Sequence, residues 1–201
     1  QALYNVVDML VVGKIVGAIG LAAISNASML CFIINSLCIG LTMGGSVLVA
    51  QYKGADDQKG QRDTIGMLFV LSLAASVVVT MLGLVVYEPL FRALDVPAEA
   101  YPDACSYMEI ICWGTVFVFG YNTVCSILKG LGDSKTPLFF VGVATIFNVL
   151  LDVLLVGPCS MGTVGAAWAT ITAQGVSFVG SLVYLRRHQM SVSLRKIKFR
   201  R

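Results

Sequence analysis

The sequence predicts an all-α membrane protein with six transmembrane helices. Of its 201 residues, 57% are hydrophobic and only 12% are charged, which is too apolar for a surface that faces water. Long runs without a charged residue also recur, and a run of about 20 apolar residues is enough to cross a hydrocarbon core about 30 Å thick. The net charge of +3 is too small for a nucleic-acid binder. Soluble enzymes, DNA-binding modules and disordered tails are therefore excluded.

The first three apolar stretches follow one another between short polar segments. Residues 1–12 are too few for a crossing and are interpreted as the second half of a truncated helix. A turn at residues 17–20 precedes the second helix, which we expect over about residues 21–52. The third is expected over residues 65–87, because Glu88 and Pro89 follow and proline cannot continue the helical hydrogen bonds.

Three further stretches complete the set. The fourth helix is expected over residues 102–128, before a polar turn, residues 129–137, with two glycines and a proline that break any helix. The fifth is expected over residues 138–156. A tight reversal separates it from the sixth, expected over residues 164–185, and a basic tail, residues 186–201, follows.

The placement of lysine and arginine predicts the orientation, because short basic loops stay in the cytoplasm. Twelve of the fourteen basic residues lie after the even-numbered helices: Lys53, Lys59, Arg62, Lys129, Lys135, Arg186, Arg187, Arg195, Lys196, Lys198, Arg200 and Arg201. We therefore expect a multi-pass protein of the bacterial inner membrane with a cytoplasmic N-terminus and C-terminal tail. Membrane lipids are its surroundings, and the tail is suited to contact anionic lipid.

Enzymatic and cofactor chemistry find no support in the motifs. The six cysteines are scattered without a C-x-x-C pair, and the single histidine, His188, lies in the basic tail. No nucleophile-base pair, zinc motif or disulfide framework is recognisable, so the sequence predicts neither an enzyme nor a bound cofactor.

Ionisable residues within the apolar stretches are the candidate functional residues, because each is costly in a bilayer unless it meets a partner or water. Asp8, Glu109 and Asp152 qualify, and asparagine accompanies two of them: Asn5 lies three residues before Asp8, and Asn148 lies four before Asp152, on the same helix face. Carboxylate and amide oxygens suit a hard cation, and a buried carboxylate also carries a proton.

Several of these residues have a second interpretation. Thr170 or Thr172 can supply a hydroxyl ligand, although threonine in membrane helices often bonds its own backbone. Asp8 and Asp152 can instead hold helices together as polar contacts, and Glu109 lies near enough to the outer end of its helix to reach the interface. Gly40 and Gly44 form a G-x-x-x-G pair, which predicts close helix packing.

Five segments together resemble one known family, the multidrug and toxic compound extrusion (MATE) transporters. They are Leu3-Tyr4-Asn5-Val6-Val7-Asp8, Leu48-Val49-Ala50-Gln51-Tyr52-Lys53-Gly54-Ala55, Lys129-Gly130-Leu131-Gly132-Asp133-Ser134-Lys135-Thr136-Pro137, Asn148-x-x-x-Asp152 and Gly165-Ala166-Ala167-Trp168-Ala169-Thr170. The resemblance covers nearly the whole chain, in order and with the family's loop spacing.

The resemblance implies twelve helices in two six-helix lobes, of which this chain is the N-terminal lobe, residues 1–185. Residues 186–201 are then the start of the linker to a missing C-terminal lobe. It also implies a cation site made by Asp8, Asn148, Asp152 and Thr170. The choice of Thr170 over Thr172 rests on the resemblance alone. Asn5, Glu109 and Thr172 are secondary candidates.

The function that these features favour is a cation-coupled antiporter that exports small organic, often cationic, compounds. Either Na⁺ or H⁺ is the coupling ion, because a buried carboxylate serves both. The alternatives are a flippase of lipid-linked precursors from the same superfamily and a half-size six-helix channel or structural protein. A flippase predicts a more cationic cavity, whereas no lysine or arginine lies in the middle of an expected helix.

Overall fold

Six helices make up the part of the chain that the computed structural model describes, which is the backbone of residues 2–198 and the side chains of residues 6–187. They are α1 (Ala2–Ile15), α2 (Ala18–Gly54), α3 (Gln58–Ala93), α4 (Tyr101–Gly130), α5 (Lys135–Val156) and α6 (Gly162–Lys198). Five of them are long and apolar enough to cross a membrane, and α1, with 14 residues, is too short. The predicted all-α class and six helices are confirmed.

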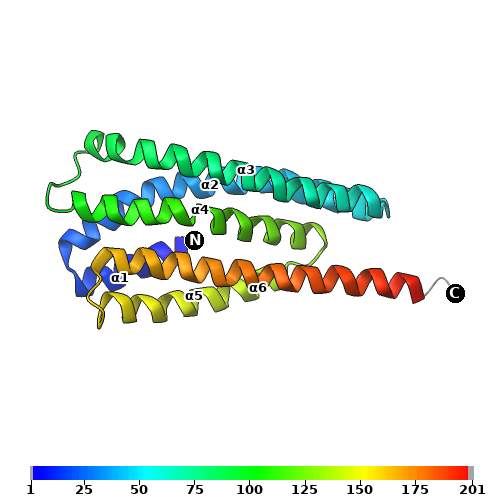
Figure 1. The fold of residues 1–201 in the computed structure, drawn as a ribbon. Coiled ribbons are helices and arrows are strands. Elements are labelled where there is room, and N and C mark those ends of the chain that lie inside the picture. The colour runs from blue at the N-terminus through cyan, green and yellow to red at the C-terminus, as the bar shows by residue number, and fades with distance from the viewer. Residues whose placement is uncertain (1, 199–201) are drawn as a thin grey trace.

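The helices lie side by side in one bundle, with α3 along one edge, α5 along the opposite edge, and α4 and α6 between them (Figure 1). The α1–α2, α3–α4 and α5–α6 connections gather at one end of the bundle. The α2–α3 and α4–α5 connections and the C-terminal end of α6 lie at the other end, which we call the basic end because the basic loops gather there (Figure 1). The charge pattern predicts that the basic end is cytoplasmic.

Three helix ends differ from the expectation by six residues or more. α3 begins at Gln58 rather than near residue 65, so the polar residues before 65 already belong to the helix. α3 continues through Pro89 to Ala93, so the predicted stop at Glu88 and Pro89 is wrong. A proline so near the end removes only one backbone hydrogen bond, and the last turn is held because Phe91 is completely buried. α6 is helical to Lys198 rather than ending near residue 185, which leaves the linker role of residues 186–201 a prediction.

A glycine makes the turn between the first two helices. Gly17 has a φ of 92°, a conformation that residues with a Cβ rarely adopt, and α2 starts at the next residue. Gly20 already belongs to α2, where a Cβ would lie 2.7 Å from Cγ1 of Val12. Of the predicted turn at residues 17–20, only Gly17 lies outside a helix. The lack of a side chain at Gly20 lets α1 and α2 pack closely.

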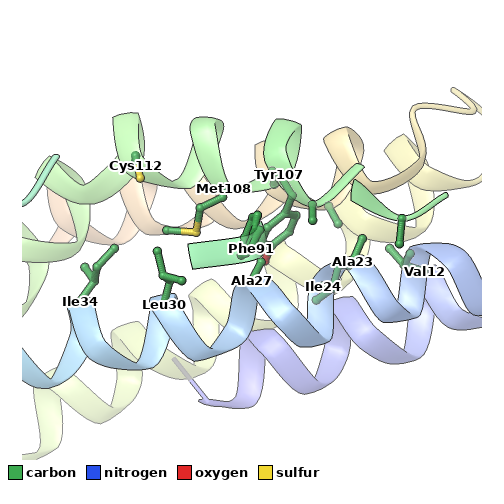
Figure 2. Close-up of a cluster of buried hydrophobic side chains, with 14 of the residues drawn as sticks. Val12, Ala23, Ile24, Ala27, Leu30, Ile34, Phe91, Tyr107, Met108 and Cys112 are labelled. Atoms are coloured by element: carbon green, nitrogen blue, oxygen red, sulfur yellow. The ribbon is translucent and has the colours of Figure 1, made fainter. Parts of the chain in front are cut away.

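The larger hydrophobic cluster fills the half of the bundle away from the basic end. In Figure 2, Leu30 and Ile34 of α2 point toward Met108 and Cys112 of α4. Val12 of α1 belongs to the same cluster and, like Met108 and Cys112, is completely buried. Aliphatic and sulfur side chains thus close this half of the lobe to water.

Small residues near the start of α6 let this helix pack closely against its neighbours: Ala166, Ala167 and Ala169 are completely buried. Gly40 and Gly44 are exposed, and a Cβ added to either would meet nothing within 4 Å, so within this lobe the expected packing role is wrong.

The α4–α5 turn is built by the glycines and the aspartate of its motif. At Gly130 a Cβ would lie 2.6 Å from the backbone oxygen of Ser46 on α2, and Gly132 has a φ of 81°. Asp133 accepts hydrogen bonds from the Thr136 backbone N–H at 3.0 Å, its hydroxyl at 2.6 Å, and the Tyr184 hydroxyl at 3.1 Å. The turn is thereby joined to the start of α5 and to α6.

These bonds make the stability contribution of Asp133 dependent on pH. The hydrogen bond from the Thr136 side chain holds the pKa of Asp133 below its usual value. A folded-state pKa below the unfolded one, about 3.9, contributes stability that is complete above that value and is lost as pH falls through the folded pKa. We predict that Asp133→Asn lowers the free energy of unfolding in detergent by about 1 kcal/mol at pH 7.

The difference in the free energy of unfolding between wild type and Asp133→Asn should stay constant from pH 8 to about pH 5 and should disappear below about pH 4. Unfolding followed by circular dichroism measures it, with Glu99→Gln, an exposed loop carboxyl, as the control. If Asp133→Asn and Glu99→Gln lowered the free energy of unfolding equally at pH 7, the hydrogen bonds of Asp133 would not stabilise the fold as proposed.

Candidate cation site

Four helices place polar side chains at one buried point of the lobe. Asp8 comes from α1, Tyr107 from α4, Asn148 and Asp152 from α5, and Thr170 from α6. Asp8, Tyr107, Asn148 and Asp152 each have 0% of their surface exposed. Asn148 and Asp152 share the inner face of α5 because they lie four residues apart, as the sequence predicts.

Hydrogen bonds link three of the helices through Asp8. The Tyr107 hydroxyl donates to Oδ2 of Asp8 at 2.8 Å. The Thr170 hydroxyl lies 3.2 Å from Oδ1 and 3.0 Å from Oδ2 of the same carboxylate. Nδ2 of Asn148 donates to the Thr170 hydroxyl oxygen at 3.2 Å, which brings α5 into the network. Asp8 is therefore the point at which α1 is attached to α4 and α6.

Three oxygens of the cluster have no hydrogen-bond donor among the described residues. They are both carboxylate oxygens of Asp152 and Oδ1 of Asn148, and all three are buried. The Asp152 carboxyl group also lies close enough to that of Asp8 for the two to interact directly. A buried acceptor without a donor costs about 1–3 kcal/mol, and two adjacent buried carboxylates repel each other. A proton or a cation between them removes both costs.

The ligand types favour a small monovalent ion over a transition metal. No group of three or more histidine, cysteine, aspartate or glutamate side chains that could hold a metal lies within the described side chains. The cluster instead offers two carboxylates, an amide oxygen and a hydroxyl, all hard oxygen donors. Such a set fits Na⁺, and its carboxylates equally fit a proton.

The structure brings together the four principal predicted residues and leaves two of the secondary candidates, Glu109 and Thr172, apart from them. Glu109 is exposed on the surface of α4, and Thr172 is exposed on the face of α6 that points away from Thr170. The side chain of Asn5 lies outside the described residues. The fully buried carboxyl groups of the lobe are thus Asp8 and Asp152 among the side chains of residues 6–187.

Tyr107 is the residue of the site that the sequence does not single out. A tyrosine within a membrane helix usually places its hydroxyl at the interface, so it attracts no attention beside buried carboxylates. Tyr107 faces the interior of the bundle and is completely buried, so its hydroxyl needs a buried acceptor, which Asp8 supplies. Its position in the sequence does not by itself distinguish it from a tyrosine that reaches the interface.

Comparisons with known proteins agree on one kind of protein. A family model described as MatE matches residues 1–154. The chain is 35% identical over 190 residues to the probable multidrug resistance protein YpnP of Bacillus subtilis, covering 94% of this chain and 43% of that protein. It therefore spans less than half the length of this curated relative.

Solved structures give the same result. The inward-facing conformation of a multidrug resistance MATE family transporter of the MOP superfamily matches with a TM-score of 0.87 and 28% identity, over 92% of this chain and 42% of that one. An outward-facing conformation matches with a TM-score of 0.85 and 29% identity, over 92% and 41%. The arrangement of these six helices is therefore similar to one lobe in both conformations.

The Tyr107 contact generates a stability prediction. We expect Tyr107→Phe to lower the free energy of unfolding in detergent by about 1.5–3 kcal/mol, the range for a hydrogen bond to a charged group. Tyr121→Phe is the matched control, because its hydroxyl donates to the neutral backbone oxygen of Pro137. A loss in Tyr107→Phe no larger than in Tyr121→Phe would show that Tyr107 does not hold Asp8.

Proposed function

The chain belongs to the MatE family, the multidrug and toxic compound extrusion transporters, and on that premise we propose that it forms the cation-binding lobe of a drug antiporter. The observation that carries the proposal is the set of unpartnered buried oxygens on Asp152 and Asn148 beside Asp8. The coupling ion is Na⁺ or H⁺, and the exported compounds are small organic molecules. A second lobe, C-terminal to this one, completes the transporter.

Binding of the ion would act first on the two carboxylates. Without it, Asp8 and Asp152 repel each other across the junction between α1 and α5. With it, both can be drawn to the same ion, and the oxygens of Asn148 and Thr170 are within the same network. The membrane potential favours entry of the ion by about 2.3 kcal/mol per charge per 100 mV.

Coupling to the drug would follow from a movement of α1. Asp8 accepts hydrogen bonds from hydroxyl groups of α4 and α6. If the ion weakens or replaces these hydrogen bonds, the position of α1 against both helices changes. An ion can shift such an equilibrium only by its different affinity for the two arrangements. We propose that the ion-bound arrangement has the lower affinity for the drug, which is released as the ion enters.

The competing functions make different demands on the lobe. A flippase for phosphate-bearing lipid carriers requires cationic side chains in the cavity, whereas Lys14, Arg92 and Lys129 all lie in the last turns of their helices. A half-size channel requires conductance without a coupled ion. The location that we propose is the bacterial inner membrane, with the basic end in the cytoplasm.

Ion binding is measurable on the purified chain through Trp168, which lies on the outer face of α6 and reports a movement of that helix rather than a contact with the ion. In a Trp113→Phe background, we expect the fluorescence of Trp168 to respond to Na⁺ at constant ionic strength or to a pH jump. Asp152→Asn should abolish that response, because it removes one of the two charges. The control is Thr172→Val, on the exposed face of the same helix.

A wild type that responds to neither ion would refute the proposed site. So would an Asp152→Asn variant that responds like the wild type. A response to Na⁺ at fixed pH identifies sodium as the ion, and a response to pH alone identifies the proton.

Transport is tested in a full-length transporter that carries this lobe, expressed in cells loaded with ethidium. We expect Asp152→Asn to lower the rate of ethidium efflux at least about tenfold, because loss of about 1.4 kcal/mol of coupling already gives that factor. Thr172→Val should retain the wild-type rate. Efflux by Asp152→Asn at the wild-type rate would exclude Asp152 from coupling.

A further inference from the structure

A line of polar side chains runs along the inner face of α6 from the cation site toward the basic end. Thr170, Gln174, Ser177 and Ser181 follow one another at intervals of four, three and four residues, which places them on one helix face. Gln174, Ser177 and Ser181 are buried, with 2%, 3% and 0% of their surface exposed. The line ends near Tyr184, whose hydroxyl donates to Asp133.

The spacing of this line suits the passage of a small ion. With a rise of about 1.5 Å per residue, neighbouring members of the line lie about 4.5–6 Å apart along the helix axis. One water molecule between two side-chain oxygens spans such an interval. The line covers about 21 Å between Thr170 and Tyr184, which is more than half of the thickness of a hydrocarbon core of about 30 Å.

Among these residues, Gln174 has a buried polar atom that packing does not explain. Its Oε1 atom is buried and has no hydrogen-bond donor among the described residues. It lies one turn of α6 from Thr170, and Oδ1 of Asn148, within the cation site, is unpartnered as well. Buried amide oxygens without a donor are rare in native proteins, and an oxygen that receives a passing cation or water would have this appearance.

The opposite direction along the same face offers no comparable line. From Thr170 away from the basic end, the next polar side chain on this face of α6 is Thr163, and buried Ala166 and Ala167 lie between them. Val12 of α1 and Val156 of α5 are also buried in this half. Apolar side chains therefore close the site on that side, whereas polar ones lead away from it toward the basic end.

We propose that the buried face of α6 formed by Gln174, Ser177 and Ser181 is the path by which the coupling cation moves between the site and the basic end. The cation is Na⁺ or a hydrated proton, and Gln174 is the first oxygen that it meets after leaving Asp8 and Asp152. No bond is made or broken for Na⁺, which exchanges one set of oxygen ligands for the next. The inference rests on the proposed cation site.

The test separates the rate of ion arrival from the affinity of the site. Stopped-flow fluorescence of Trp168, in the Trp113→Phe background, follows a Na⁺ jump in one arm and a pH jump in the other. We expect Gln174→Leu, which keeps the volume and removes the oxygen, to slow the response about tenfold, the factor produced by losing one ordinary hydrogen bond. The equilibrium affinity should stay within about twofold of wild type.

Controls on both sides of α6 make the result specific. Thr172→Val, at nearly the same depth on the exposed face, should leave the rate of the response unchanged. If Gln174→Leu fails to fold, Ser181→Val takes its place as the test variant, and it should also slow the response. Wild-type rates in Gln174→Leu and Ser181→Val would overturn the path while leaving the cation site intact. An affinity that falls in step with the rate would also overturn it, because Gln174 would then be a ligand of the site. A wild type without any response would overturn the site and the path together.

Discussion

Two carboxylates, Asp8 and Asp152, lie next to each other in the buried centre of a lobe that is otherwise apolar. This arrangement is unfavourable without a proton or cation between them, because both groups are fully buried and no lysine or arginine among the side chains of residues 6–187 is buried beside them to balance the charge. Much of the surrounding structure serves to hold the pair. Tyr107 and Thr170 fix Asp8 by donating to its oxygens, and α5 presents Asp152 and Asn148 from the same face.

The lobe around this pair is built asymmetrically. The half that contains Val12, Leu30 and Met108 is closed by apolar side chains (Figure 2). The half toward the basic end carries serine and glutamine on the inner face of α6 and ends at a turn organised by Asp133. A buried charge pair with polar surroundings on one side only is an arrangement in which an ion can be exchanged with that side while the other remains sealed.

Much of the fold and most of the site follow from the sequence, for physical reasons that differ between residues. Hydropathy predicts the six helices because a bilayer requires long apolar runs, and the spacing of Asn148 and Asp152 places both on one face. Thr170 required a resemblance, because nothing local distinguishes it from Thr172. Tyr107 was missed because a tyrosine suits an interface as well as a buried site. The helix end predicted at Pro89 and the packing role predicted for Gly40 were wrong, because both depend on tertiary packing. Phe91 anchors the turn after Pro89, and none of the described helices covers Gly40.

Infrared difference spectroscopy of the carboxyl groups tests most directly whether Asp8 and Asp152 hold a proton or cation between them. At neutral pH and without Na⁺, a protonated carboxyl band should be present in the wild type. The band should be absent in the double variant Asp8→Asn, Asp152→Asn. It should also disappear when the bound proton is displaced, by Na⁺ or by raised pH. A spectrum without any protonated carboxyl band in Na⁺-free buffer would mean that both groups are ionised with nothing between them, and would contradict the account.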